Sequence, residues 1–177
     1  MSRTKKITLT AMMVSLSITI NLFMKMMPFL QLGEGGTFFS LTALPIIYAG
    51  LALGPVWGVF AGVCYGLLDF ILDGAAYGIL SLIFDYVLAF GVLGLVGLFK
   101  KQFKEGKNWI VIIAIVAFEL VRLFSHTISS ILVFGATFGY GFITYNGPVI
   151  LSSTAAVIIV YLLTQKKIAN YLNNHSY

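Results

Sequence analysis

Charged residues are scarce in this sequence: Asp, Glu, Lys and Arg together make up only 10% of its 177 residues. A water-soluble domain keeps roughly 25% charged residues to cover its surface, so this composition excludes an ordinary soluble protein. Lipid is the solvent that fits, because 59% of the residues are hydrophobic and the mean hydropathy is +0.98. The length allows at most about six or seven membrane crossings of about 20 residues each. We therefore expect residues 1–177 to form one membrane domain.

Cysteine and histidine are nearly absent, and this excludes several kinds of site. The single cysteine, Cys64, allows no intramolecular disulfide and no CxxC metal site. The H-E-x-x-H of a metalloprotease and the G-x-S-x-G of a serine hydrolase are missing, and Gly106-Lys107 lacks the upstream glycine of a P-loop. The Lys and Arg residues form no continuous patch for nucleic acid. We expect no enzyme, metal site, cofactor or nucleic-acid partner.

Six hydrophobic runs, each bounded by glycine, proline or charge, predict an all-α membrane protein with six transmembrane helices. The runs are Ile7–Phe23, Phe38–Leu53, Pro55–Leu72, Tyr77–Phe99, Trp109–Phe134 and Asn146–Leu163. The first run follows a basic start, as in a signal peptide, but it is long and no A-x-A-like cleavage site follows it. We therefore expect it to be retained as the first helix.

Basic residues predict the orientation, because positively charged flanks resist translocation across the membrane. They gather before the first helix, between the fourth and fifth helices, and after the sixth: Arg3, Lys5, Lys6, Lys100, Lys101, Lys104, Lys107, Lys166 and Lys167. Six crossings place all three clusters on one side. The opposite side holds Lys25, Glu34, Asp69 and Asp73 and is net acidic. Both termini are therefore predicted to be cytoplasmic.

Small residues repeat along two of the predicted helices, where they let helices approach closely in lipid. The repeats are Gly91, Gly94 and Gly97 in the fourth helix and Ala11, Ser15 and Thr19 in the first. One interpretation is packing inside the bundle. The other is a docking face for another membrane protein, which suits the first helix because a terminal helix often has an outward face.

Four ionisable side chains lie inside predicted helices, where a charge costs about 2.5 to 3.5 kcal/mol on insertion scales. They are Asp85, Glu119, Arg122 and His126. Asp85 and His126 each lie roughly 12 Å below the outer ends of their helices, so they can face one another across a cavity open to the outside. Glu119 and Arg122 have the i, i+3 spacing of an ion pair, which would be a buried structural contact.

Aromatic and amide side chains are expected at the same depth as Asp85 and His126: Tyr86, Phe134, Tyr140, Tyr145 and Asn146. A carboxylate, an imidazole, an amide and several rings suit a cationic, planar, hydrogen-bonding small molecule. Two alternatives remain open. In the first, Asp85 and His126 form a hydrogen bond with each other inside the bundle and bind no ligand. In the second, the aromatic residues serve as anchors of the helices at the membrane interface.

Five segments, in the same order along the chain, carry a resemblance to a known family. They are GGTFFSLTALPI from Gly35, GVFAGVCYGLL from Gly58, LIFDYVLAF from Leu82, RLFSHTIS from Arg122 and TYNG from Thr144. These segments resemble the thiamine-specific substrate-binding subunits, or S components, of energy-coupling factor transporters. The acidic-Tyr-x-x-Ala motif together with the basic-x-x-x-His motif is the more specific part of the pattern.

The resemblance implies a six-helix S component in the bacterial plasma membrane that captures thiamine from outside in an occluded pocket. It implies that this pocket is lined by Asp85, Tyr86, His126, Phe134 and Asn146. It also implies two kinds of partner, a membrane coupling protein (EcfT-type) and two cytosolic ATPases (EcfA-type). The small residues of the first helix, Ala11, Ser15 and Thr19, match the family's docking face for the coupling protein.

One departure from the family concerns the sixth helix. The family often has a tyrosine five residues before the helix-six asparagine, where this chain has Gly141, with Tyr140 one position further back. A site retuned toward a thiamine precursor or another vitamin is therefore an alternative. A ligand-free structural or regulatory membrane subunit is a third hypothesis.

Overall fold

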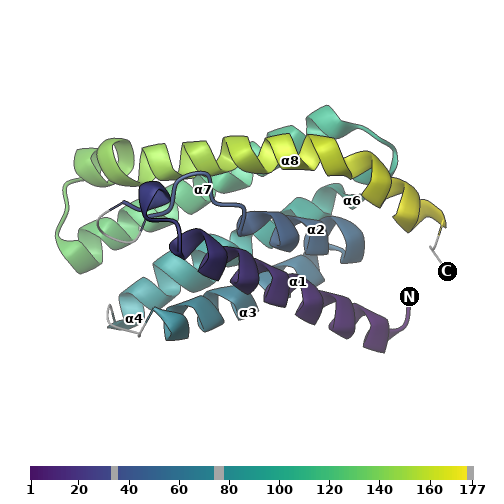
Figure 1. Ribbon diagram of the computed structural model, residues 1–177, viewed down its shortest axis with the longest axis horizontal. Helices are drawn as coiled ribbons and strands as arrows, with labels where there is room; N and C mark the ends of the chain where they lie inside the picture. The colour runs from purple at the N-terminus through teal and green to yellow at the C-terminus, as the bar shows by residue number, and fades with distance from the viewer. Residues whose placement is uncertain (33–35, 74–77, 175–177) are drawn as a thin grey trace.

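The structure, a computed structural model, describes residues 1–32, 36–73 and 78–174. In these residues the regular structure is helical, apart from one isolated antiparallel bridge between Gln31 and Thr37. The helices are α1 (Arg3–Lys25), η1 (Pro28–Leu30), α2 (Ala43–Leu53), α3 (Pro55–Leu72), α4 (Gly78–Ser81), η2 (Leu82–Leu88), α5 (Ala89–Gly91), η3 (Val92–Phe99), α6 (Lys100–Lys104), α7 (Asn108–Phe134), η4 (Tyr140–Asn146) and α8 (Gly147–Asn174). The segments from α4 to α6 form one continuous rod, as do η4 and α8 (Figure 1).

Five helical rods are long and apolar enough to cross a membrane: 3–25, 55–72, 78–104, 108–134 and 140–174. All six predicted hydrophobic segments are helical, and this confirms the predicted fold class. The ends of the helices differ from the ends of the predicted runs, because the helices continue through polar residues that a hydrophobic run excludes. The sixth segment was predicted to span only Asn146–Leu163, and the predicted start of the fourth, Tyr77, lies outside the described residues.

The second segment is shorter than predicted. It was expected to begin at Phe38, but α2 begins at Ala43 and has eleven residues, about 16 Å of helix. Phe39 has a left-handed backbone with φ of 55°, which an α-helix does not accommodate. The amide groups of Phe39 and Ser40 donate instead to hydroxyl groups of α8, at 3.2 and 3.0 Å. Contacts with α8 therefore replace the first helical turn.

The path of the chain brings its two ends together. Figure 1 shows that α1 begins and α8 ends at the same end of the molecule. The segment before α2 lies against α8, and α2 then continues toward the end where α1 begins. The short α2 thus runs in the direction opposite to α1, although with eleven residues it is not among the five rods long enough to cross a membrane.

Glycines let α2, α3 and η3 touch backbone to backbone. A Cβ atom added to Gly94 would lie 2.0 Å from the carbonyl carbon of Gly58, and one added to Gly97 would lie 2.6 Å from the carbonyl oxygen of Gly50. These distances leave no room for a side chain. For the fourth-helix glycines, packing inside the bundle is therefore the correct interpretation.

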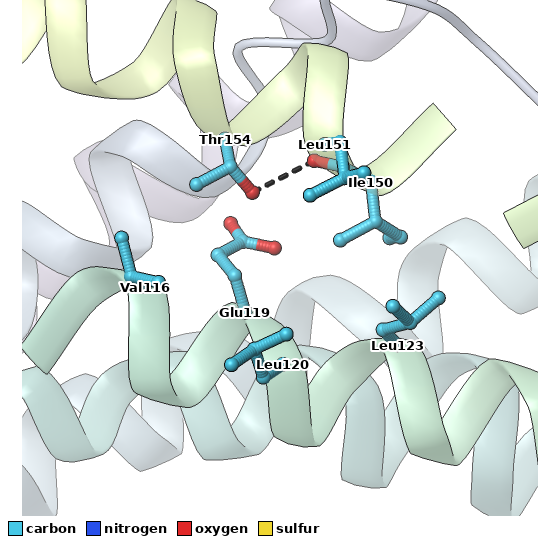
Figure 2. Close-up of a pocket in the computed structure, with 7 residues that line it drawn as sticks. All are labelled: Val116, Glu119, Leu120, Leu123, Ile150, Leu151 and Thr154. Carbon is cyan, nitrogen blue, oxygen red and sulfur yellow. Dashed lines mark hydrogen bonds between the residues drawn. The ribbon is translucent and has the colours of Figure 1, made fainter. Parts of the chain in front are cut away.

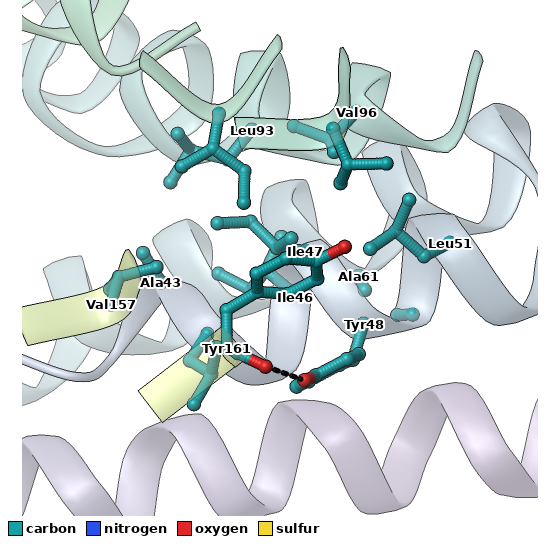
Figure 3. Close-up of a cluster of buried hydrophobic side chains, with 14 of the residues drawn as sticks. Ala43, Ile46, Ile47, Tyr48, Leu51, Ala61, Leu93, Val96, Val157 and Tyr161 are labelled. Carbon is teal, nitrogen blue, oxygen red and sulfur yellow. Dashed lines mark hydrogen bonds between the residues drawn. The ribbon is translucent and has the colours of Figure 1, made fainter. Parts of the chain in front are cut away.

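A cluster of buried hydrophobic side chains includes residues of α2, η3, α6 and α8 (Figure 3). The rings of Tyr48, Phe103 and Tyr161 have centroids 6.1 to 6.2 Å apart. The Tyr48 hydroxyl lies 2.6 Å from that of Thr164 on α8. Phe103 and Asp85 lie on the same rod, roughly 27 Å apart along its length. The ring cluster of Tyr48, Phe103 and Tyr161 therefore lies away from Asp85.

Candidate functional site

Two π-helical segments carry most of the predicted site residues. Asp85 and Tyr86 lie in η2, and Tyr140, Tyr145 and Asn146 lie in η4. Both segments pack against α7, the helix of His126. Short π-helical segments within longer helices occur frequently at functional sites. The η2–α7–η4 region is therefore the candidate site.

The centre of this region is a direct contact between Asp85 and His126. The Asp85 Oδ1 atom lies 2.9 Å from His126 Nδ1. The other carboxylate oxygen accepts hydrogen bonds from Ser81, at 2.7 Å, and from Ser129. The Asp85 and His126 side chains keep 19% and 17% of their surface exposed, so the protein does not enclose the pair completely.

The second ring nitrogen of His126 faces Arg122. The Arg122 Nε–H group donates to His126 Nε2 at 3.4 Å, and a terminal nitrogen of Arg122 lies 3.3 Å from Glu119 Oε2. The predicted Glu119–Arg122 ion pair is therefore present. The Arg122 guanidinium also lies 4.6 Å from the centroid of the Phe90 ring, as in a cation–π contact. Four ionisable side chains thus form one continuous chain.

Asn146 joins the same region from η4. Its amide nitrogen donates to Ser130 Oγ and to the Gly141 carbonyl oxygen, each at 2.9 Å. The Ser130 hydroxyl donates in turn to the His126 carbonyl oxygen. A Cβ atom at position 141 would lie 3.1 Å from the Ser130 Cβ, so Gly141 allows η4 to lie close to α7. This approach is a local reason for glycine where the family often has tyrosine.

The other four predicted site residues lie elsewhere around this region. Tyr86 faces α3, where its hydroxyl donates to Asp73 at 2.8 Å. Tyr145 accepts a hydrogen bond from the Gly36 amide at 3.1 Å. Phe134 and Tyr140 are exposed, at 58% and 46%. Hydrogen bonds therefore join Asp85, His126 and Asn146 into one region, while these four residues lie around it.

Two serines that were not among the predicted site residues hold Asp85 in place. Ser81 lies four residues before Asp85 on the same rod, and Ser129 lies three residues after His126 on α7. Both spacings place the serine on the same helix face as its ionisable neighbour, and this was the available signal. The two hydroxyl groups donate to Asp85 Oδ2, the carboxylate oxygen that His126 does not contact.

A second polar cluster links α1 to α3. Asp69 is 6% exposed and accepts hydrogen bonds from Asn21, Lys25 and Tyr65. Lys25 also pairs with Asp73. Three of the predicted outer charges, Lys25, Asp69 and Asp73, therefore lie in one cluster, and Asp73 also accepts the hydrogen bond from Tyr86. The fourth, Glu34, lies outside the described residues.

The small-residue stripe of α1 faces outward. Ala11, Ser15 and Thr19 are exposed and line a hollow of about 540 Å³ together with neighbouring α1 side chains. Packing inside the bundle therefore does not describe this stripe. A second cavity, of about 20 Å³, lies between α7 and α8 beside Glu119. Neither cavity has Asp85 or His126 among its lining residues.

Within the described ranges, no group of three or more His, Cys, Asp or Glu side chains is placed to hold a metal ion. The arrangement instead offers hydrogen-bonding groups and one carboxylate beside aromatic rings. Such a set of side chains is suited to holding a small molecule without covalent chemistry.

Comparisons with known proteins identify the family and a similar fold. A family model described as "Thiamine transporter protein (Thia_YuaJ)" matches residues 7–173. The structure of ThiT from Listeria monocytogenes has a similar fold, with a TM-score of 0.74 and 21% sequence identity over 94% of this chain and 98% of that chain. The search of curated proteins found no match.

Proposed function

The chain belongs to the thiamine transporter family, and from this premise we propose that it is the substrate-binding subunit, or S component, that captures thiamine outside the cell. As a multi-pass membrane protein of that family it is a transport protein and not an enzyme. In the proposal, uptake is driven by ATP hydrolysis in separate subunits of an energy-coupling factor transporter, and residues 1–177 act as one binding domain.

The Asp85–His126 contact is the observation that carries the ligand proposal. Thiamine joins a cationic thiazolium ring to an aminopyrimidine ring. Asp85 supplies a partly exposed carboxylate as the counter-charge. A charge inside a membrane helix is energetically costly, so its presence there indicates a functional site. Asn146 on η4 supplies an amide oxygen for the polar edge of the pyrimidine, and His126 on α7 holds Asp85 in place, since its two ring nitrogens face Asp85 and Arg122.

Aromatic walls complete the proposed pocket. Tyr86, Phe134, Tyr140 and Tyr145 are the rings that we assign to it. Phe134 and Tyr140 flank the turn between α7 and η4 and are largely exposed. We expect these two rings to turn over the ligand when it binds, since side-chain rearrangement at binding sites is common.

The proposed orientation places both termini in the cytoplasm. The ends of α1 and α8, with their Lys and Arg clusters, lie at one end of the molecule, and this supports the positive-inside assignment. Lys25, Asp69 and Asp73 lie near the opposite ends of α1 and α3. The Asp85 site is nearer that end, which is the end that faces outward in this proposal.

The proposed partners are a membrane coupling protein and two cytosolic ATPases. The exposed stripe of Ala11, Ser15 and Thr19 is the proposed docking face for the coupling protein. Its small side chains would let a partner helix approach the α1 backbone closely in lipid.

Titration of the purified protein with thiamine tests the proposal. Saturable binding by isothermal titration calorimetry, together with quenching of aromatic fluorescence, is the expected result. Competition with hydroxymethylpyrimidine and riboflavin separates thiamine from the alternatives of a precursor or another vitamin, which the departure from the family at Gly141 suggests. No bound molecule by mass spectrometry after mild purification, and no binding in any titration, would favour a ligand-free regulatory subunit.

A further inference from the structure

Behind the Asp85–His126 contact, the α7 helix holds two further charges in the interior. Glu119 is 1% exposed and Arg122 is 7% exposed. A buried ion pair is weak evidence for stability, because the cost of removing both charges from water offsets their attraction. The contact between Arg122 and His126 gives this pair a different role.

The directions of the hydrogen bonds define the proton position on His126. Arginine has only donors, so the Nε–H group of Arg122 at 3.4 Å requires a lone pair on His126 Nε2. An ionised carboxylate has only acceptors, so Asp85 at 2.9 Å requires the proton on Nδ1. A doubly protonated ring or the opposite tautomer would turn an N–H group of His126 toward that of Arg122.

The net charge around His126 depends on the charged groups of all elements that pack against it. The charged or titratable groups that face His126 are Asp85 from η2, and Arg122 and Glu119 from α7 itself. Arg122 and Glu119 cancel each other, and the Nδ1–H form of His126 is neutral. One negative charge remains, and it lies on Asp85.

We propose, on the basis of the thiamine-binding function above, that Arg122 and Glu119 are positioning residues that keep His126 neutral with its proton on Nδ1. The site then presents an uncompensated carboxylate, and this selects a monocationic ligand over neutral or anionic analogues. An imidazolium at position 126 would neutralise Asp85 and remove that selectivity.

Glu119 is placed to remain the counter-ion of Arg122. Figure 2 shows its side chain reaching from α7 toward Thr154 of α8. Its Oε1 atom has no hydrogen-bond partner among the described residues and borders the 20 Å³ cavity. A cavity of this size holds one water molecule, which would satisfy that oxygen.

Nitrogen NMR tests the proton position without any ligand. The chain has only two histidines, so His175→Asn leaves His126 as the single signal in ¹⁵N-histidine-labelled protein. We expect a protonated Nδ1 and an unprotonated Nε2 at pH 7. The double variant Glu119→Gln/Arg122→Met keeps the charge balance but removes the donor to Nε2, and we expect a tautomer mixture or an imidazolium. An Nε2–H or imidazolium spectrum in the parent protein, or an unchanged spectrum in the double variant, would overturn the proposal.

Affinity measurements test the charge balance separately. Glu119→Gln leaves Arg122 uncompensated, so we expect thiamine affinity to fall at least tenfold while the affinity for neutral hydroxymethylpyrimidine changes less than twofold. Equal loss for both ligands would indicate a merely structural role and overturn the proposal. If the parent protein binds no thiamine, the proposed function fails, whereas the NMR result still decides the proton position.

Discussion

The Asp85 Oδ1 and His126 Nδ1 atoms lie 2.9 Å apart although the two residues are 41 positions apart along the chain. One is held on a π-helical segment by two serine hydroxyls, and the other is held on α7 by Arg122. The contact therefore depends on two helices keeping their relative height and rotation. Ligand binding, in the proposed function, begins at this contact.

Replacing Asp85 with asparagine tests the counter-charge. Asn keeps the shape and can still accept from a serine, but it removes the negative charge. We expect thiamine affinity to fall at least tenfold, about 1.4 kcal/mol, in calorimetric titration. Glu105→Gln, in the turn between α6 and α7, removes a charge far from the site and serves as the control. Unchanged affinity in Asp85→Asn would defeat the assignment.

Replacing His126 with alanine tests the second half of the contact. The change removes the partner of Asp85 Oδ1 and of Arg122 Nε. We expect at least a tenfold loss of thiamine affinity, with folding retained in circular dichroism and size-exclusion chromatography. Parent-like affinity in a folded His126→Ala protein would exclude the imidazole from the site.

Adding one methyl group at Gly94 tests the glycine contact. In Gly94→Ala the new Cβ would lie 2.0 Å from the Gly58 backbone, which cannot move aside like a flexible side chain. We expect the free energy of unfolding to fall by about 3 kcal/mol or more, seen as a lower midpoint of thermal unfolding in detergent. Gly139→Ala is the control, because nothing lies within 4 Å of its added Cβ. Equal midpoints for the two variants would contradict the contact.

Removing the Asp69 carboxylate tests the cluster between α1 and α3. Asp69→Ala leaves the buried Asn21 amide and the Tyr65 hydroxyl without their acceptor, so we expect a loss of about 3 kcal/mol in the free energy of unfolding. Asp73→Ala should cost less, since the Asp73 side chain is 30% exposed and water can replace it. Thermal unfolding of both variants measures the difference, and a larger loss in Asp73→Ala would contradict this ranking.

A bulky side chain on the α1 stripe tests the docking proposal. Ser15→Trp fills the hollow on α1, so we expect it to abolish transport in cells while calorimetric thiamine binding by the purified protein remains unchanged. Ile159→Trp places the same ring on an exposed position of α8, and we expect normal transport. Loss of binding in Ser15→Trp would indicate misfolding, and normal transport would remove α1 from the docking face.

The six helical segments could be predicted from the sequence because hydrophobic runs report burial in lipid directly. The start of α2 could not, since it depends on Phe39 and Ser40 donating to hydroxyls on α8. Those partners are more than a hundred residues away, and no local pattern encodes them.

For the candidate site, counting residues from the helix ends predicted that Asp85 and His126 lie at one level. The π-helical segments were not predicted, because a change of helical pitch leaves no signature in hydrophobicity. The direction of the Tyr86 side chain was not predictable from the sequence either. Its hydroxyl bonds to Asp73 on another helix, so its direction follows from that pairing and not from its position beside Asp85.

The backbone contact between Gly58 and Gly94 has a consequence for how a ligand can enter. Helices that touch backbone to backbone have no flexible side chains between them that could rearrange. We therefore expect α2, α3 and η3 to keep their relative positions when a ligand enters. We therefore expect any opening of the Asp85 region to occur on the side of α7 and η4. Gly135 and Gly139, where nothing lies within 4 Å of an added Cβ, are the positions at which we expect the backbone to bend during such an opening.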